Sequence, residues 1–535
     1  MSPCHPFPLS VLSLRHSTGL YIIAPRPRIP MHLSPLKTAT LFILLVLGTG
    51  CESRTASLPS SSSPTVSQAS PAVTPSPTPD PQTFNRAMDA AMSAATIAQS
   101  AISPEDWQMV ARQWERAIAL LKSLSPSHPK KALAQRKIDE YRRNLTIARQ
   151  RVKGQVFAAQ NPSQTSSPAS RLNFLVFAGG GAPHYNEIAL EKNVLYFQRT
   201  LANLGEIRDR VAIFFANGND GQASIRYLNS QRQERFKVPN IPHLRGAATI
   251  QNFQNWIETV IQQRDSRPIF FYFTGHGYKN EKNIDNNALI FWNEEYLSVQ
   301  QFARQLERLP QKNPVVTVMA QCYSGSFANF IYEQGNPNLS VALQTRCGFF
   351  ATIKTQPSVG CTAEVNEADY RDYSSSFFAG LSGISRTGET VPSADYNKDG
   401  KVSYAEAHSF AKIDEHTTDL PVSTSEVWLQ RQRSEAQKAQ LLQKPIAQFL
   451  QTARLEQQYV VNSLVQKFGF NPAQSFTENS RQFDLSNKVE KAYLTRLKME
   501  LLNIGIEEQI RSGGNFATIA ILNRLIECEG ESWKK

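Results

Sequence analysis

Two stretches of this chain decide its fold class. The first is Ile269-Phe270-Phe271-Tyr272-Phe273-Thr274-Gly275-His276-Gly277, and the second is Val315-Val316-Thr317-Val318-Met319-Ala320-Gln321-Cys322-Tyr323-Ser324-Gly325. Each begins with five β-branched, aromatic or other apolar residues and ends in a turn that contains glycine. Runs of this length and composition predict strands that are buried on both faces.

Three similar apolar runs occupy residues 174–177, 211–215 and 349–353. Helical patterns separate the runs, for example over 249–262 and 298–309. Alternation of strands and helices predicts an α/β fold with a parallel sheet covered by helices on both faces. We expect this domain over 171–430, between a helical hairpin at 84–154 that is similar to repeat units and a helical C-terminal region at 431–535.

The two strand ends carry residues suited to nucleophilic catalysis. Functional groups in open parallel sheets gather beyond the carboxyl ends of the strands, so we expect His276 and Cys322 at one sheet edge. A thiolate attacks carbonyl carbon, and an imidazole moves the protons. The backbone amides of Gly277 and Cys322 are candidates to bind the developing oxyanion. This chemistry needs no cofactor.

These motifs resemble the caspase-fold cysteine peptidases, and the legumain family more closely. In that family a strand ending in His-Gly is followed by one ending in Cys-x-Ser-Gly. Gly180-Gly181 with His184-Tyr185-Asn186 is similar to the family's glycine-rich turn and Trp-Tyr-Asn, whose asparagine assists the histidine. The resemblance implies a caspase-like sandwich, protein or peptide substrates, a thioester at Cys322 and Asn186 as a third catalytic residue.

The chain departs from the legumain pattern at two positions. Ile188 stands where the family has its substrate-pocket arginine, and Ala320 stands where the family has a glutamate. The resemblance therefore does not extend to an asparaginyl preference. Acidic residues in the loop after the fifth strand suggest a basic residue at the cleavage site instead. These residues are Glu364, Glu367 and Asp369.

Two other functions are compatible with the same motifs. Legumain relatives include transpeptidases and ligases, in which an amine replaces water in the second step. A caspase-like domain without activity is the other alternative, acting as a calcium-dependent module that binds protein partners through its helical segments.

Residues 395–406 fit the twelve-residue EF-hand calcium loop. The spacing places oxygen ligands around a central Gly400 that permits the sharp turn. The predicted ligands are the side chains of Asp395, Asn397, Asp399, Ser403 and Glu406 and the carbonyl of Lys401. We expect a structural or regulatory Ca²⁺, with an acidic turn that binds no metal as the alternative.

The N-terminus carries targeting signals. From Met31, the predicted start, Lys37 and the apolar run 41–47 lead to small residues and then Cys51, an order that resembles a bacterial lipobox. We expect a signal region at 1–50, lipidation of Cys51, and an extracytoplasmic protein that is anchored to a bacterial membrane. A secreted protein with an ordinary cleaved signal is the alternative.

Composition adds three expectations. Ser/Pro-rich stretches predict an extended tether at 51–83 and a linker at 155–170. The formal charge of +12 is spread along the chain without a block of basic residues, so no nucleic-acid partner is expected. Cys347 and Cys361 are candidates for a disulfide in an oxidising compartment, and the pattern assigns no role to Cys528.

Overall fold

The computed structural model describes residues 83–533 except 101–103, 127, 160–171, 207–210, 482 and 484–485. The predicted signal region, Cys51, nearly all of the tether and most of the 155–170 linker lie outside the described residues. Among the helices of the described part, none has both the length and the apolar composition needed to cross a membrane.

The N-terminal part of the described chain is a three-helix bundle with its own core. It consists of α1 (Thr83–Ser100), α2 (Pro104–Lys122) and α3 (Lys131–Ala159). Trp114 of α2 packs on Tyr141 of α3 with ring centroids 4.9 Å apart. The sequence predicted a hairpin here, and the structure adds α1, whose buried face consists largely of alanines such as Ala87 and Ala94. Such small residues give a weak helical signal.

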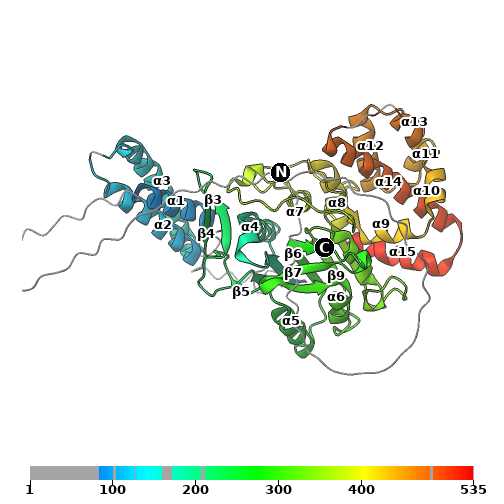
Figure 1. Cartoon of the computed structure of the whole chain (residues 1–535), viewed down its shortest axis with the longest axis horizontal. Coiled ribbons are helices and arrows are strands. Elements are labelled where there is room, and N and C mark those ends of the chain that lie inside the picture. The colour runs from blue at the N-terminus through cyan, green and yellow to red at the C-terminus, as the bar shows by residue number, and fades with distance from the viewer. Residues whose placement is uncertain are drawn as a thin grey trace, which may run out of the picture. The chain divides into compact units, whose positions relative to one another are not determined.

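A nine-stranded sheet forms the centre of the α/β domain (Figure 1). Its main path runs β11-β10-β9-β6-β1-β2-β5. Every neighbouring pair from β10 to β5 is parallel, and only β11 on this path is antiparallel. The strands are β1 (Asn173–Gly179), β2 (Val211–Phe215), β5 (Leu244–Gly246), β6 (Ile269–Tyr278), β9 (Val315–Met319), β10 (Arg346–Phe350) and β11 (Val422–Ser423). Two more strands, β7 (Ala288–Phe291) and β8 (Glu295–Ser298), extend β6 on one side. The predicted caspase-like α/β fold is confirmed.

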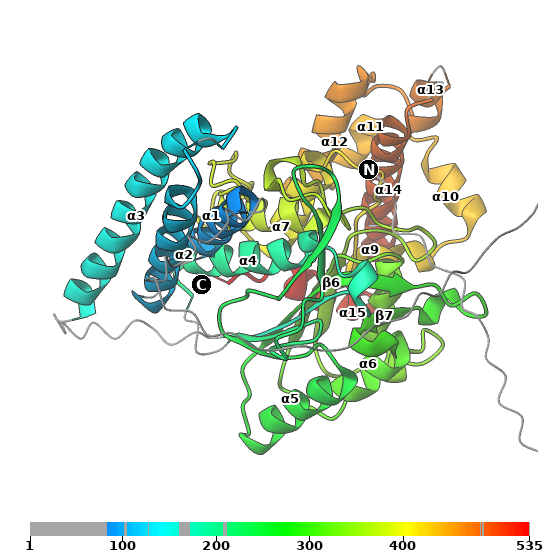
Figure 2. The same ribbon diagram turned by 60° about the vertical axis from the view of Figure 1, so that its left-hand side comes forward.

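Helices cover both faces of the sheet because the side chains of each strand alternate between two cores. Leu175 and Phe177 face a core with α5 (Ile250–Gln262) and α6 (Val299–Leu306), whereas Phe174 and Val176 face a core with the helices of the other side. Those helices are α4 (Ile188–Asn203), α7 (Tyr373–Ser382) and α8 (Tyr404–Asp414). Figure 2 shows the two layers on opposite sides of the strands.

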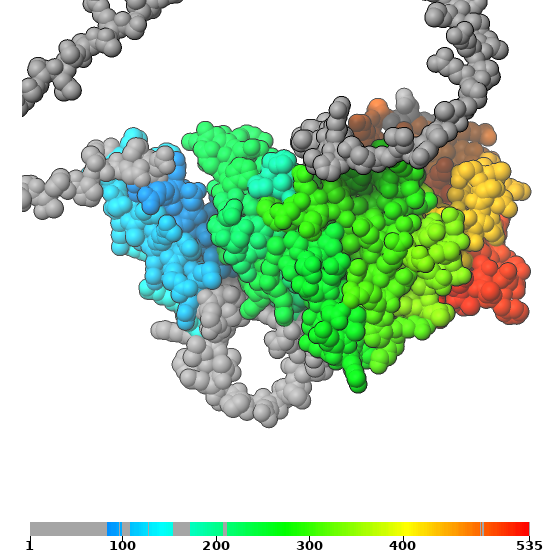
Figure 3. Space-filling model, turned by 60° about the horizontal axis from the view of Figure 1, so that its bottom comes forward, coloured from blue at the N-terminus to red at the C-terminus, as the bar shows by residue number. Residues whose placement is uncertain are grey.

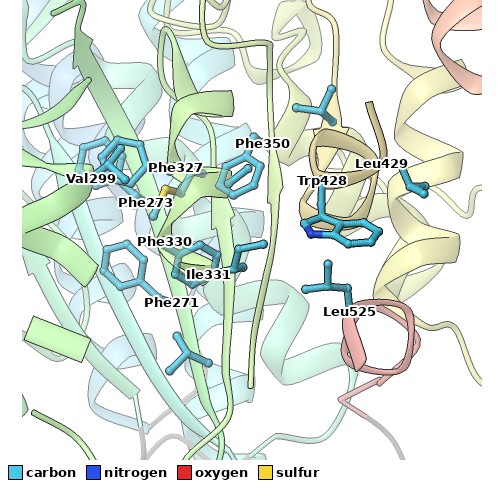
Figure 4. Packing of buried hydrophobic residues seen from close by; sticks show 14 of the residues in the cluster. Phe271, Phe273, Val299, Phe327, Phe330, Ile331, Phe350, Trp428, Leu429 and Leu525 are labelled. Atoms are coloured by element: carbon cyan, nitrogen blue, oxygen red, sulfur yellow. The ribbon is translucent and has the colours of Figure 1, made fainter. Parts of the chain in front are cut away.

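The described residues of the C-terminal region form seven helices that pack against the α/β domain. They are α9 (Thr424–Arg431), α10 (Glu435–Leu441), α11 (Ile446–Leu450), α12 (Leu455–Phe468), α13 (Phe476–Ser480), α14 (Lys488–Ser512) and α15 (Phe516–Glu529). Trp428, Leu429 and Leu525 belong to the same buried cluster as Phe350 and the strand phenylalanines (Figure 4). In Figure 3 the yellow and red surfaces of these helices adjoin the yellow-green surface of the α/β domain.

The end of the chain returns to the sheet. Cys528 of α15 forms a disulfide with Cys347 of β10, so the candidate pairing of Cys347 with Cys361 is not the one observed. The sequence assigned no role to Cys528, because only the packing of α15 on β10 brings it close to Cys347. Beyond the disulfide, Trp533 is buried with its ring 5.1 Å from that of Phe174. The C-terminal region is therefore part of the domain core.

We predict that the Cys347–Cys528 disulfide stabilises the fold substantially, because it closes a chain segment of 181 residues. Cys528→Ser should lower the free energy of unfolding by about 2–5 kcal/mol, measured by urea denaturation without reductant. Dithiothreitol should lower the wild-type midpoint and affect the variant less. Ready alkylation of both cysteines in the folded, unreduced protein would contradict the disulfide.

Candidate active site

His276 and Cys322 lie at the carboxyl ends of two neighbouring strands. β6 and β9 are parallel with Phe273 opposite Met319, and the backbone N–H of Ala320 donates to the carbonyl of Phe273 at 2.9 Å. His276 and Cys322 each follow this pair by three residues, His276 within β6 and Cys322 in the turn after β9. The two motifs that the sequence singled out thus share one edge of the sheet.

Gly277 lets the two strand ends approach each other closely. A Cβ atom at this position would lie 2.0 Å from the carbonyl oxygen of Cys322, which is far inside van der Waals contact. Beyond Gly275, β6 leaves the parallel ladder and pairs with β7 instead, with His276 opposite Ile290. This change of partner opens the sheet edge at the histidine.

Asn186, the residue expected to assist His276, forms hydrogen bonds elsewhere. Its Oδ1 accepts from the backbone N–H of Gly180 at 2.9 Å, and its Nδ2 donates to the carbonyl of Ser224 at 3.2 Å. The side chain is fully buried. In this structure Asn186 therefore holds the glycine-rich turn after β1 in shape and does not contact the histidine ring.

The carboxylate of Glu187 takes the place beside the histidine. Its Oε2 lies 3.0 Å from Nε2 of His276, and its Oε1 lies 2.8 Å from Nη2 of Arg226. Burial alone raises the pKa of Glu187, but His276 and Arg226 outweigh burial and hold this pKa at about 2. The ring of Tyr185 meets the His276 ring edge to face, with centroids 5.4 Å apart. The imidazole is thus fixed by a charge and an aromatic ring.

Sequence reasoning missed Glu187 because the family pattern directs attention to the asparagine before it. A signal was present in principle. Glu187 is an acidic residue directly after the motif, and it precedes the apolar start of α4, for which it is the N-cap residue. The partner Arg226 comes from β3 (Ile225–Leu228), which bridges to Glu187. That pairing is visible only in three dimensions.

Cys322 is a reduced, buried thiol with 3 % of its surface exposed. The backbone N–H of Ser358 donates to its Sγ at 3.3 Å. Burial raises the pKa of the Cys322 thiol to about 12, and the nearby Asp419 adds to the rise, while the Ser358 N–H opposes it. The following residue, Tyr323, has φ of 59°, a left-handed conformation that non-glycine residues rarely adopt. Such strain is typical of functional turns.

A comparison with protein families agrees with this arrangement. Residues 243–361 match the model of the Peptidase C13 family, and this segment contains His276, Cys322 and Ser358. This segment is therefore similar to the legumain family of cysteine peptidases. None of the curated proteins matches the chain.

The legumain-like domain has no arginine at position 188 and no glutamate at position 320. Ile188 is buried in the core at the start of α4. Of the acidic residues expected at the pocket, Glu367 is buried within 3.1 Å of Lys192 and 2.9 Å of Arg199, and Glu364 pairs with Arg232. The chain's own bases compensate these two charges, so the expected preference for a basic residue loses its main support.

The 395–406 loop has the conformation of a compact turn closed by its last residue. The carboxylate of Asp395 accepts from the backbone N–H groups of Asp399 and Gly400 at 3.1 and 3.0 Å. Glu406 reaches back to accept from the N–H of Asn397 at 3.2 Å. Gly400 has φ of +83°. Two more of the predicted ligands have hydrogen-bonding roles in this turn. The backbone N–H of Lys401 donates to Asp399, and Ser403 is the N-cap residue of α8.

The donor set of this loop fits a calcium ion. Carboxylate, amide and carbonyl oxygens are the ligands that Ca²⁺ prefers, and the hydrogen bonds gather the loop's first and last carboxylates around one turn. Both carboxylate oxygens of Glu406 accept hydrogen bonds from backbone amides in this structure. A bound Ca²⁺ would therefore take the place of some of these hydrogen bonds.

We predict that Cys322 is a neutral, slowly reacting thiol in the substrate-free protein. Because its pKa is raised to about 12, alkylation of the Cys322 peptide by iodoacetamide should be slow at pH 7–9 and accelerate only at higher pH. In urea the same peptide should show the ordinary thiol profile, with a midpoint near pH ~8.5. A native midpoint at or below pH 7 would indicate a thiolate stabilised in the resting state and would contradict the prediction.

Proposed function

We propose that this chain is an extracytoplasmic cysteine endopeptidase, with Cys322 as nucleophile and His276 as general acid and base. The observation that carries the proposal is the parallel pairing of β6 with β9, which brings the strand ends that carry the two residues to one edge of the sheet. The match of residues 243–361 to a peptidase family supports it.

The proposed reaction has two steps. In the first, Sγ of Cys322 attacks the scissile carbonyl carbon, the C–N bond breaks, and the leaving amine takes a proton from His276. In the second, water attacks the thioester, the C–S bond breaks, and a carboxylic acid and the thiol are released. The N–H groups of Gly277 and Cys322 are proposed to bind the oxyanion in both steps.

Glu187 is proposed to position His276 for this reaction. With Nε2 facing the carboxylate, Nδ1, which lies 3.9 Å from Sγ of Cys361 in this structure, is the ring nitrogen left to serve the thiol and the leaving group in the proposed reaction. A buried carboxylate beside the ring stabilises the imidazolium that forms when the histidine takes the proton of the thiol. Because the pKa of Cys322 is high in the resting site, this transfer is expected when substrate binds and contacts the thiol.

Three further features are proposed from the sequence. Signal cleavage before Cys51 and its lipidation would anchor the chain outside the cytoplasm of a bacterium, and the Cys347–Cys528 disulfide supports an oxidising compartment. Ca²⁺ bound at 395–406 would have a structural or regulatory role. The three-helix bundle is a candidate surface for a protein partner.

We predict that protein lacking residues 1–82 cleaves a diverse peptide mixture, read by mass spectrometry. Cys322→Ala should abolish cleavage, and His276→Ala should lower kcat by about 10²–10⁴-fold because proton transfer is lost. His128→Ala, in the separate helical bundle, is the matched histidine control and should leave the rate unchanged. Products that gain an amine in place of water would identify a transpeptidase or ligase.

The absence of any Cys322-dependent product from folded protein, with and without calcium, would contradict the proposal. The chain would then be better described as a binding module with a caspase-like fold. A rate unaffected by His276→Ala would also contradict the assigned roles.

We predict that Ca²⁺ stabilises the fold through Glu406. At a free concentration about 100 times the dissociation constant, the free energy of unfolding should rise by about 2.7 kcal/mol, seen as a higher Tm. An unpaired loop outside the cytoplasm suits a dissociation constant on the order of 0.1–1 mM. Glu406→Gln should abolish the rise, whereas Glu389→Gln, an exposed acid just before the loop, should retain it. An equal rise in Tm with Ca²⁺ in both variants would mean that Ca²⁺ binds at another site.

A further inference from the structure

A segment between the α/β domain and the C-terminal helices lies directly behind the nucleophile. Residues 412–420 leave the end of α8 and run to β11, where the C-terminal region begins. On one side this segment contacts α14, and on the other it contacts the loops around Cys322. It is therefore the point at which the C-terminal helices reach the candidate active site.

Arg496 of α14 holds this segment through a dense set of hydrogen bonds. The side chain is 2 % exposed, and its guanidinium donates to oxygens spread along the whole turn. The acceptors are the carbonyls of Lys412 (2.8 Å), Glu415 (3.1 Å), Thr417 (3.2 Å) and Asp419 (2.7 and 3.0 Å) and the carboxylate of Glu415 (2.8 Å). Because these oxygens surround a planar fork, no other side chain could satisfy them all.

Two further contacts tie α14 to the same segment. The hydroxyl of Tyr493 donates to the carbonyls of Ile413 and Glu415, at 3.0 and 2.9 Å. Nζ of Lys412 lies 2.6 Å from the carboxylate of Glu500. Buried charges are retained only where they are compensated, so this helix and this segment are matched to each other.

Asp419, which belongs to residues 412–420, contacts the Ser358 loop that lies against the thiol of Cys322. Its carboxylate is fully buried and accepts from the hydroxyl of Ser358 at 2.6 Å and from the N–H of Val359 at 3.0 Å. The N–H of Ser358 in turn donates to Sγ of Cys322 at 3.3 Å. Arg496, Asp419, Ser358 and Cys322 thus form one continuous chain of hydrogen bonds.

A second connection reaches the turn that follows the nucleophile. The N–H of Leu420 donates to the hydroxyl of Thr352 at 3.4 Å. The carbonyl of Thr352 accepts from the N–H of Gly325 at 2.8 Å, and its own N–H donates to the hydroxyl of Ser324 at 3.1 Å. The segment therefore supports Cys322 from both sides.

We propose that Arg496 and Asp419 are positioning residues through which the C-terminal helices hold the Ser358 loop against Cys322. This gives the C-terminal region a role in catalysis although it lies outside the matched family segment. The inference rests on the proposed function of Cys322 as nucleophile. Without the hydrogen bonds of Arg496 to residues 412–420, the Ser358 loop moves away from Sγ of Cys322. The thiol then becomes more accessible to solvent but is less well oriented for attack.

The test compares Arg496→Lys and Asp419→Asn with wild type. Lysine keeps the charge but cannot bridge the separated carbonyls, and asparagine keeps one of the two acceptor oxygens. Arg454→Lys is the matched control, since Arg454 also bridges two acids, the partly buried Glu456 and the buried Glu507, but entirely within the C-terminal region. Each protein is first shown to be folded at the assay temperature by near-ultraviolet circular dichroism and Tm.

Two quantities are then measured for each variant: kcat and KM for a cleaved peptide, and the rate of iodoacetamide alkylation of Cys322. We expect Arg496→Lys to lower kcat by about 100-fold, the cost of a misplacement of about 1 Å, with KM changed much less. Alkylation should become several-fold faster. Asp419→Asn should change both quantities in the same directions by smaller factors, and Arg454→Lys should match wild type in both.

A folded Arg496→Lys protein with wild-type kcat and wild-type alkylation rate would overturn the inference. If Arg496→Lys does not fold, wild-type values for Asp419→Asn overturn it equally. Cleavage failing in wild type would refute the proposed function alone, because the alkylation comparison still shows whether the C-terminal helices control Cys322.

Discussion

The parallel pairing of β6 with β9 is the constraint on which the candidate site depends. Both strands are buried on two faces, and a slip by one residue would move every side chain of one strand into the opposite core. That pairing brings the strand ends that carry His276 and Cys322 to the same edge of the sheet. The close approach of the two strand ends requires glycine at position 277, because any side chain there would collide with the carbonyl of Cys322.

Much of this fold could be predicted from the sequence, because five of the strands are long apolar runs. Runs 174–177, 211–215, 269–273 and 315–319 lie within β1, β2, β6 and β9, and the fifth run overlaps β10. The short strands β5 and β11 were missed, since three-residue and two-residue strands carry no periodicity. The Cys347–Cys528 pair was missed for a different reason: its partners are brought together only by packing of the last helix.

The pair at the centre of the site could be predicted as well, but its surroundings could not. His276 and Cys322 could be picked out because each follows an apolar run that predicts a strand. Glu187 and Arg226 are brought together by a β-bridge between two segments, and no sequence motif links these segments. The links from Arg496 to Asp419 span 77 residues and join two regions that sequence separates. Such long-range polar contacts are set by the folded core and leave no local signal.

Together these contacts act on the histidine and on the thiol of the candidate site in different ways. The carboxylate of Glu187 holds the imidazole, and burial raises the pKa of the Cys322 thiol. The most direct test of Cys322 as nucleophile is acid quenching of the protein during turnover of a slowly hydrolysed peptide ester, followed by intact-mass and peptide mapping. The account predicts an acyl group as a thioester on Cys322, absent from Cys322→Ala. Turnover without any acyl adduct on Cys322, or with the acyl group on another residue, would contradict it.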